Sequence, residues 1–307
     1  MRRAFLVVAA VAMLVPTQAL AAPDCKRYPE ARVLVDGLDS LESTIVDRRG
    51  RLFFAGTGKL YRLDRPDAEP VVLAEGIDAP GGMAFDAEGF LILGFGDSIA
   101  NGAQGDADPN AGLLRVDPDT GAHTIFAEGL SMGNGLARGP GGEYYASNDI
   151  VGGIDRISPD GTTVEHRWAN VNSANGLVID RAKQTLFSAQ TFQPAAIARV
   201  PLDDPAAAST YFSAPPADVA AGLDGMVRDR RNRLYVAANG AGEVWRVNRK
   251  PEACSLASMP AFPDGPSALT FGRGKRGFDR KNLYVVAFNG QVTELAGVRG
   301  PRRRPKS

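Results

Sequence analysis

The sequence predicts an all-β protein, a six-bladed β-propeller with four antiparallel strands in each blade. Two short strand patterns recur six times and in step with each other, and a repeat of this period is typical of propellers. The first pattern is an apolar run with a head residue at its start, small or polar, and an Asp or Gly five residues later. Its copies span residues 42–47, 81–86, 134–139, 175–180, 224–229 and 267–272.

The other strands of each blade follow in order. A turn and a second apolar run come after each first strand, at 52–54, 90–93, 144–145, 185–187, 234–236 and 283–285. The second pattern, apolar-x-Arg-apolar, has the alternation of a half-buried strand. It occurs at 60–63, 113–116, 154–157, 197–200 and 244–247, and at 292–295 Glu294 replaces the arginine. Turn-forming residues follow two of these strands. Each unit is thus about 40 to 50 residues long, the size of a blade.

The two ends of the chain are expected to lie outside the ring. Residues 1–21 combine a basic pair, an apolar stretch and small residues before Ala22, the pattern of a secretory signal peptide. A membrane anchor is the alternative, but the apolar stretch is short for a bilayer span. We predict a signal peptide at 1–21, one propeller domain at 22–298 and a basic, disordered tail at 299–307. The protein is expected to be a periplasmic or extracellular monomer, with the export route left open.

The charge distribution argues against a nucleic-acid partner. The formal net charge of the whole chain is zero, but basic residues gather at its two ends. Without Arg2, Arg3 and the four basic residues of 301–307, 29 Lys and Arg remain against 35 Asp and Glu, a net charge of about −6. Nucleic-acid binding needs a positive surface. We therefore expect no nucleic acid as partner, and no membrane insertion once the signal peptide is removed.

Cys25 and Cys254 are the two cysteines of the chain. In an exported protein, two cysteines are more often paired than free. Cys25 precedes the first blade, and Cys254 follows the Arg strand of the fifth. A bridge would tie the start of the ring to its late part, where the ends of the chain must meet. We predict this disulfide, with two free thiols as the alternative.

The head residues of the first pattern are candidate metal ligands. In a propeller the first strand of each blade lines the central channel, so equivalent positions form a ring. Their side chains offer only oxygen ligands, which suit one hard cation, Ca²⁺ first, with Mg²⁺, Mn²⁺ or Zn²⁺ as alternatives. Asn and Asp before Gly are also common turn residues, which is the plainer interpretation. The six heads are Glu42, Gly81, Asn134, Asn175, Asp224 and Ser267.

A further set of polar residues lies at or just beyond the ends of the second strands. Those ends return to the face that carries the heads, so the residues are candidates for a substrate pocket, with solvated loop positions as the alternative. The set is Asp97, Asn148, Asp149, Gln190 and Asn239. The longest Gly/Asn/Asp-rich insertion, residues 97–112, would be either a lid over this face or a solvated loop.

Three features together are typical of a known protein family. They are four of the heads (Glu42, Asn134, Asn175 and Asp224), the Asn-Gly-Leu and Asp-Gly-Met contexts, and the Arg strands. Over roughly residues 30–297 the chain resembles the senescence-marker-protein/gluconolactonase/luciferin-regenerating-enzyme-like family of six-bladed propellers, and more distantly the paraoxonases. The resemblance implies a divalent cation at the top of the channel and hydrolysis of lactones or phosphotriesters. It also implies that Glu42, Asn175 and Asp224 are metal ligands and that Asn134 is a further ligand or a substrate contact.

The chain departs from the paraoxonase pattern in its histidines. Paraoxonases carry a Pro-His-Gly motif at the start of the second blade, where this chain has Pro80-Gly81-Gly82. Its two histidines, His123 and His166, fall near outer strands and are expected to be surface or packing residues. A histidine-dyad mechanism is therefore not expected.

These observations predict a metal-dependent hydrolase of lactones or related esters, with a small-molecule substrate. The cation would polarise the carbonyl, and Asp224 would act as general base or nucleophile. Glu42 would balance the charge of the ion. The alternative is a non-catalytic binding propeller whose cation is structural. Activity on lactones and esters with and without chelator would separate the two.

Overall fold

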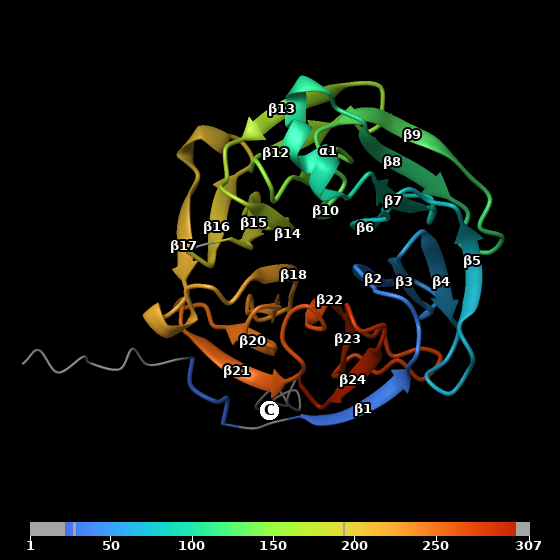
Figure 1. The fold of residues 1–307 in the computed structure, drawn as a ribbon, viewed down its shortest axis with the longest axis vertical. Coiled ribbons are helices and arrows are strands. Elements are labelled where there is room, and N and C mark those ends of the chain that lie inside the picture. Colours follow the sequence, from blue (N-terminus) through green and yellow to red (C-terminus); the bar gives the residue numbers. More distant parts are fainter. Residues whose placement is uncertain (1–21, 27–28, 193, 299–307) are drawn as a thin grey trace, which may run out of the picture.

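Six four-stranded antiparallel sheets surround one axis and form the predicted six-bladed propeller (Figure 1). The computed structural model describes residues 22–26, 29–192 and 194–298. The predicted signal peptide at 1–21 and the predicted tail at 299–307 lie outside the described residues. In each sheet the strand nearest the axis is the first pattern found in the sequence, and the strand two places outward is the Arg pattern.

The first three blades follow one another in chain order, each running from its innermost to its outermost strand. Blade one is β2 (Ser43–Val46), β3 (Leu52–Gly56), β4 (Lys59–Leu63) and β5 (Val71–Glu75). Blade two is β6 (Met83–Phe85), β7 (Leu91–Phe95), β8 (Ala111–Val116) and β9 (His123–Leu130). Blade three is β10 (Leu136–Arg138), β11 (Tyr144–Ser147), β12 (Ile154–Ile157) and β13 (Val164–Ala169).

The next two blades repeat this order, and the sixth takes its outermost strand from the beginning of the chain. Blade four is β14 (Ala174–Asp180), β15 (Thr185–Gln190), β16 (Ala196–Pro201) and β17 (Ser209–Ser213). Blade five is β18 (Leu223–Arg228), β19 (Leu234–Ala238), β20 (Glu243–Val247) and β21 (Ala253–Ser258). Blade six is β22 (Pro266–Phe271), β23 (Leu283–Ala287), β24 (Val292–Ala296) and β1 (Glu30–Val35).

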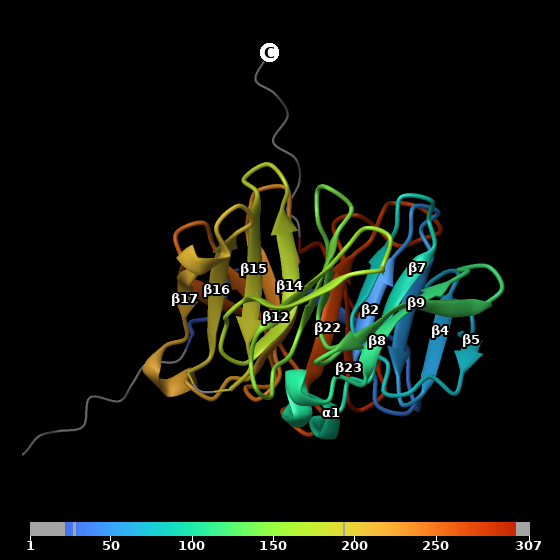
Figure 2. The same cartoon turned by 90° about the horizontal axis from the view of Figure 1, so that it is seen from above.

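Among the residues that the structure describes, helices are short and lie in the connections between strands. The helix α1 (Ile99–Gln104) and the 3₁₀ turn η1 (Gly105–Ala107) form the insertion of blade two, and Figure 2 shows α1 at one face of the ring. Two more 3₁₀ turns, η2 (Pro205–Ala207) and η3 (Pro216–Asp218), flank β17. Among the described residues, no helix has the length and apolar character needed to cross a membrane.

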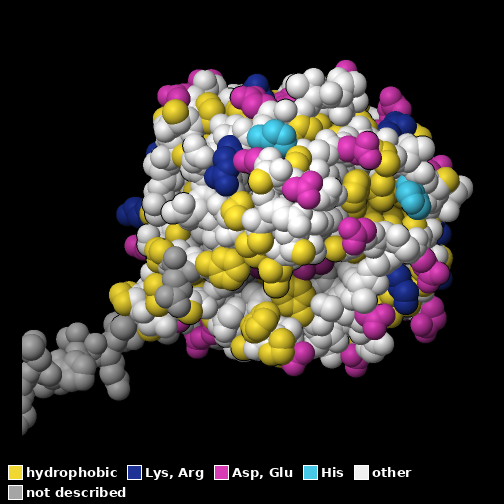
Figure 3. Space-filling model, turned by 45° about the horizontal axis from the view of Figure 1, so that its top comes forward, with side chains coloured by type: hydrophobic (Ala, Val, Ile, Leu, Met, Phe, Trp, Pro, Cys, Tyr) yellow, Lys and Arg dark blue, Asp and Glu magenta, His cyan; other side chains and the backbone are white. Residues whose placement is uncertain are grey.

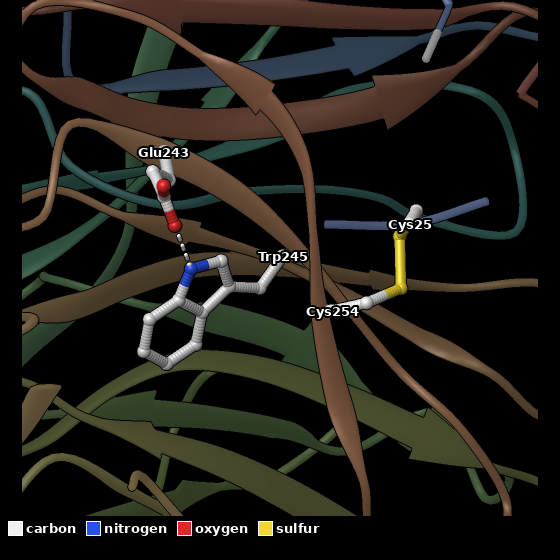
Figure 4. The surroundings of a disulfide bond; sticks show 4 residues. All are labelled: Cys25, Glu243, Trp245 and Cys254. Atoms are coloured by element: carbon white, nitrogen blue, oxygen red, sulfur yellow. Dashed lines mark hydrogen bonds between the residues drawn. A yellow bond between two sulfur atoms is a disulfide. The ribbon is translucent and has the colours of Figure 1, made fainter. Parts of the chain in front are cut away.

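The ring closes through strands from both ends of the chain. β1 pairs antiparallel with β24, with Glu30 opposite Ala296 and Arg32 opposite Glu294. A disulfide between Cys25 and Cys254, with Cα atoms 5.0 Å apart, joins the segment before β1 to β21 of blade five (Figure 4). The backbone N–H of Cys25 also donates to the carbonyl of Ser255, at 2.7 Å. The predicted Cys25–Cys254 bridge is confirmed.

The hydrophobic core lies between neighbouring blades. Strands β3, β19 and β23 are buried along their whole length, because each has another blade packed on both of its faces. Aromatic rings span these interfaces: Tyr235 of blade five meets Phe271 of blade six edge to face, with centroids 5.1 Å apart. Such pairs add specific contacts to the burial of apolar area.

The glycine after the head residue has a packing role at the axis, where innermost strands approach closely. A Cβ atom at Gly176 would lie 2.5 Å from the carbonyl oxygen of Asp224 in the next blade. At Gly135 it would lie 2.4 Å from the carbonyl oxygen of Asn175. No side chain fits at these distances. The repeated head–Gly pair therefore places a functional side chain beside a point of backbone contact.

Candidate functional site

The innermost strands bring the head residues to one face of the ring around its axis (Figure 1). Asn175 and Asp224 lie where the ladder between first and second strands shifts register, between Ala174 and Leu177 in blade four and between Leu223 and Met226 in blade five. Such bulges turn a side chain out of the regular alternation and are frequent beside active sites. Glu42 directly precedes β2, with its backbone N–H bonded to the carbonyl of Ala55 at 2.7 Å.

Four carboxylates gather at this face: Glu42 and Asp224 from heads, and Asp97 and Asp149 from the ends of second strands. Burial and repulsion between the four groups raise their pKa values. The pKa of Asp97 is raised to about 7 by burial and by Asp149, and that of Asp149 to about 6 by burial. The pKa values of Glu42 and Asp224 are raised well above the ordinary range, mainly by burial and then by the other acids.

Three asparagines face these acids. The side-chain amide of Asn134 lies against Asp97, that of Asn175 against Asp149 and that of Asn239 against Asp224, and each partly lowers the pKa of its carboxyl. We call these seven side chains the axial cluster: Glu42, Asp97, Asn134, Asp149, Asn175, Asp224 and Asn239.

The amide of Asn175 is also held from outside the cluster. Its Nδ2 donates to Thr191 Oγ1 at 2.9 Å, and that hydroxyl donates to the carbonyl of Leu223 at 3.1 Å. With its nitrogen engaged in this way, Asn175 keeps its carbonyl oxygen available as a ligand. Thr191 follows β15 and was not among the residues predicted from the sequence.

The axial cluster fits a hard divalent cation. All of its candidate ligand atoms are oxygens, the type that Ca²⁺ and Mg²⁺ prefer. In the described part of the chain, no Lys or Arg forms an ion pair with any of its four carboxylates. Asp149 is only 8% exposed, yet its Oδ1 has no hydrogen-bond partner. Buried acids without cationic partners are costly, and a bound cation would remove that cost.

The cluster is open to solvent on one side. Glu42 and Asp97 are partly accessible, whereas Asp224 is 5% exposed. Figure 3 shows a hollow on this face of the molecule with hydrophobic side chains around it and acidic side chains visible inside it. A small molecule could therefore reach the acids from this face.

The two remaining heads hold the ring together. Ser267 is fully buried, and its Oγ donates to the carbonyl of Leu41 in the neighbouring blade at 2.7 Å. Gly81 accepts a hydrogen bond from Ser43 Oγ at 2.5 Å through its carbonyl. These contacts join blade six to blade one and blade one to blade two. Neither residue contributes a side chain to the axial cluster.

Two of the predicted substrate contacts lie outside the axial cluster. Asn148 is fully buried: its Nδ2 donates to the carbonyl of Gly102 in α1 at 3.0 Å, and its Oδ1 accepts from the backbone N–H groups of Ile150 and Val151. Gln190 donates to the carbonyl of Asn172 at 2.8 Å. Asn148 thus anchors α1, while its neighbour Asp149 belongs to the cluster.

The histidines lie on outer strands, away from the axis. His123 begins β9, and its Nδ1 is 3.0 Å from the carbonyl oxygen of Gly121. His166, on β13, is 3.6 Å from both Asp106 and Asp155. These three are the group of His, Cys, Asp and Glu in the described residues whose ligand atoms all lie within 4.8 Å of one another.

That outer group is already balanced without a metal. Both oxygens of Asp155 accept backbone N–H groups, from Ser131 and from Arg167. Asp106 Oδ2 pairs with the guanidinium of Arg167 at 2.8 Å. The acids therefore have donors and a positive partner. We assign a structural role to this group.

Comparison with known proteins agrees with the fold and with the family resemblance. The model of the SMP-30/Gluconolactonase/LRE-like region matches residues 140–289. Lactonase drp35 of Staphylococcus saprophyticus is 23% identical over 266 residues, which is 82% of this chain and 79% of that protein.

Two solved structures share the propeller at low sequence identity. A gluconolactonase from Xanthomonas campestris superposes with a TM-score of 0.70 and 18% identity, covering 90% of this chain and 98% of that one. Regucalcin from Agrobacterium tumefaciens, described as a calcium-binding protein, gives a TM-score of 0.69 and 18% identity, covering 90% and 96%. The chain is thus a six-bladed propeller that resembles the SMP-30/gluconolactonase/LRE-like family, as its head residues and Arg strands predicted.

Proposed function

We propose that this protein is a divalent-cation-dependent hydrolase of lactones or related esters. One observation carries the proposal: four buried or half-buried carboxylates gather at the axis, and no Lys or Arg in the described residues pairs with them. A site of this kind calls for a cation. The similarity to lactonase drp35 and to a gluconolactonase supports lactones as the substrate class.

The ligands proposed for the cation are Glu42, Asn175 and Asp224, with Asn134 as a further ligand or a substrate contact. When bound, a hard cation with open positions polarises a substrate carbonyl and stabilises negative charge on its oxygen. Glu42 and Asp224 supply the negative charge that holds it. Asn175 supplies a carbonyl oxygen, because its amide nitrogen is turned to Thr191. Ca²⁺ is the ion we favour for this set.

Asp224 is the proposed general base. The backbone N–H of Gly225 and the amide of Asn239 act on its carboxyl and fix its orientation. Burial raises the pKa of this carboxyl in the protein without metal. As a carboxylate beside the proposed cation, it would accept a proton from an attacking water. Asp97, Asp149 and Asn239 lie beside it and are the predicted substrate contacts that can still meet a bound molecule.

The rim of this face favours a substrate with an apolar part. The loops that surround the cluster carry exposed apolar side chains, among them Ile99 of α1 at 76% exposed and Phe262 at 70%. A lactone or ester offers a polar carbonyl for the axis and carbon atoms for the rim. The acids inside would repel an anionic substrate. A neutral lactone therefore suits the site best.

The alternative is a non-catalytic binding propeller with a structural cation. The outer position of both histidines favours this alternative. The axial cluster then has only carboxylates and amides, and no histidine to act as a general base. Export to the periplasm or the medium is proposed for either function. The Cys25–Cys254 disulfide supports an oxidising compartment, and the predicted signal peptide and monomeric state stay predictions.

Hydrolysis of a panel of neutral lactones, esters and phosphotriesters by the purified protein tests the proposal. Activity should disappear after treatment with a chelator and return when Ca²⁺ is added. Asp224→Asn should lower it by about 10²- to 10⁴-fold, while Asp106→Asn, which changes an acid of the outer group, should leave it unchanged. A Ca²⁺-loaded protein that is inert on the whole panel would favour the binding propeller.

A further inference from the structure

The arginines of the repeated Arg pattern differ in whether they have a partner. In four of the five blades that carry the pattern, the guanidinium pairs with a nearby side chain, and these pairs are Arg62–Asp64, Arg115–Asp86, Arg156–Glu165 and Arg199–Ser209. Arg246 of blade five is the exception. Among the described residues, no ion pair or hydrogen bond engages its guanidinium, and its Nε is buried without an acceptor. A buried donor left unpaired is uncommon in folded proteins and costs free energy.

The disulfide explains why Arg246 lacks an acid across the strand pair. In blade three, Arg156 lies opposite Glu165 of the outermost strand. In blade five, Arg246 lies opposite Cys254. Cys254 is bonded to Cys25 and anchors the N-terminal segment (Figure 4). The position that could supply an acid is therefore used for closing the ring, and the positive charge of the arginine stays unmatched.

Arg246 lines a cavity between blades five and six, at the face opposite the axial cluster. The cavity has a volume of about 190 Å³. A water molecule takes up about 30 Å³ in the liquid, so a small molecule fits. The exposed Arg231 is part of the wall, which makes the cavity accessible from solvent. Three arginines and a mainly apolar remainder form the lining: Pro29, Arg231, Arg233, Arg246, Leu256, Gly297 and Val298.

The lining carries an excess of positive charge. Arg233 is neutralised, because its Nε and Nη2 donate to Asp229 Oδ2 at 2.8 and 2.6 Å. The backbone N–H of Arg231 donates to the other oxygen of Asp229 at 2.8 Å. No Asp or Glu in the described part of the chain forms an ion pair with the guanidinium of Arg231. Asp229 thus offsets one of the three guanidinium groups, and two positive charges remain.

We propose that this cavity binds a small organic anion whose carboxylate or phosphate group pairs with Arg246. A guanidinium presents its N–H groups in a planar fork that matches two oxygens of either group. Such an anion would give the buried Nε–H of Arg246 an acceptor and would offset the charge of Arg231. Leu256 and Val298 would cover a short carbon chain. The site is separate from the axial cluster and does not depend on the proposed function.

Calorimetric titration with simple anions tests the proposal. The purified protein, in chloride buffer of low ionic strength without added metal, is titrated with acetate, butyrate and inorganic phosphate, each alone. Butyrate or phosphate should bind saturably at one site per chain, and the tighter of the two identifies the preferred anionic group. Butyrate should bind more tightly than acetate, because its longer chain reaches the apolar wall.

Three variants locate the bound anion. Arg246→Met keeps the apolar stem and should weaken binding by about 10- to 100-fold, the loss expected for a hydrogen-bonded charge. Arg246→Lys keeps the charge but loses the planar fork, so it should weaken binding as well. Arg199→Met, the equivalent change in blade four, should leave the affinity unchanged. Without anion, Arg246→Met should melt no lower than the wild type, because the guanidinium that it removes has no partner.

Two results would overturn the proposal. The first is that neither butyrate nor phosphate binds saturably at millimolar concentration. The second is an affinity that stays the same in Arg246→Met, or that falls equally in Arg199→Met, since the anion would then bind elsewhere or respond only to the net charge of the chain. Neither result depends on whether lactones are hydrolysed, so the proposed function is tested separately.

Discussion

Strand β18 carries a buried aspartate at each of its ends, and the two behave in opposite ways. Asp224 lies at its start and Asp229 just beyond its last residue, about 16 Å away along an extended strand. They are 5% and 3% exposed. Burial, Asp149 and Asp97 raise the pKa of Asp224. Burial also acts on Asp229, but the backbone N–H and guanidinium of Arg233 outweigh it and lower the pKa.

The same contrast recurs in other blades of the ring. The Asp that recurs five residues after a head meets an arginine at the face opposite the axial cluster. Asp47 pairs with Arg51 at 2.7 Å, Asp180 with Arg228 at 3.1 Å and Asp229 with Arg233 at 2.6 Å. One face thus pairs its buried acids with arginine, whereas the acids of the other face have no Lys or Arg partner among the described residues. Burial alone does not distinguish a functional acid from a structural one.

The largest expected effect is on the rate, at the axial end of β18. Asp224→Asn should lower kcat/KM for a lactone by about 10²- to 10⁴-fold, the usual contribution of a general base. Its melting temperature in EDTA should not fall, because the change removes one of four mutually repelling charges. Steady-state kinetics and thermal unfolding measure the two quantities. A variant that loses stability but keeps its rate would break the comparison.

The next effect is on stability, at the other end of the strand. Arg233→Met should lower the free energy of unfolding by about 3 to 5 kcal/mol, because it leaves Asp229 buried and unpaired. Urea denaturation measures this change. The control is Arg156→Met, which breaks the exposed pair with Glu165 and should cost no more than about 1 kcal/mol. Equal losses in the two variants would contradict the prediction.

The acids at the two faces of the ring should also make the stability depend on pH in opposite directions. Asp97 and Asp149, with folded pKa values of about 7 and about 6, hold protons more tightly in the folded protein than in the unfolded chain, where an aspartate titrates near about 4. Stability without metal should therefore fall as pH rises from about 4 to about 7. Asp229, with a lowered pKa, contributes stability above pH 4 that is lost as pH falls through its folded pKa.

Thermal unfolding across this pH range, in EDTA and in excess Ca²⁺, measures the effect. Ca²⁺ should abolish the loss between pH 4 and pH 7, since it binds the ionised carboxylates. Asp97→Asn should reduce that loss in EDTA. A pH profile that Ca²⁺ leaves unchanged would argue against a cation at the axial cluster.

The smallest effect is expected at the outer histidine. His166→Ala removes contacts of 3.6 Å to Asp106 and Asp155, but both acids keep other partners. Stability should change by less than about 1 kcal/mol, and the rate of lactone hydrolysis should stay the same. Activity and urea denaturation test both statements. A large loss of rate would move the chemistry from the axis to the outer group.

The repeat was enough to predict the blades and the register of the heads, because a propeller turns equivalent sequence positions into equivalent places around an axis. It did not predict how neighbouring loop residues divide. Asn148 and Asp149 were both predicted as substrate contacts. In the structure Asn148 is buried against α1, whereas Asp149 belongs to the axial cluster. That choice depends on backbone dihedral angles in a loop, for which a single sequence carries little information. The pairing of Asp229 with Arg233 was not predicted from the sequence either.

The exception in the repeated Arg pattern has a consequence for assembly. In blade three, Arg156 lies opposite Glu165 of the outermost strand. In blade six the signs are exchanged, because Glu294 of β24 lies opposite Arg32 of β1, at 2.7 Å. Like charges placed opposite each other on paired strands are destabilising. In each of the other five blades, Arg32 of the incoming β1 would lie opposite an arginine and be repelled. In blade six it lies opposite Glu294. The reversed charge therefore identifies the blade to which β1 must be added.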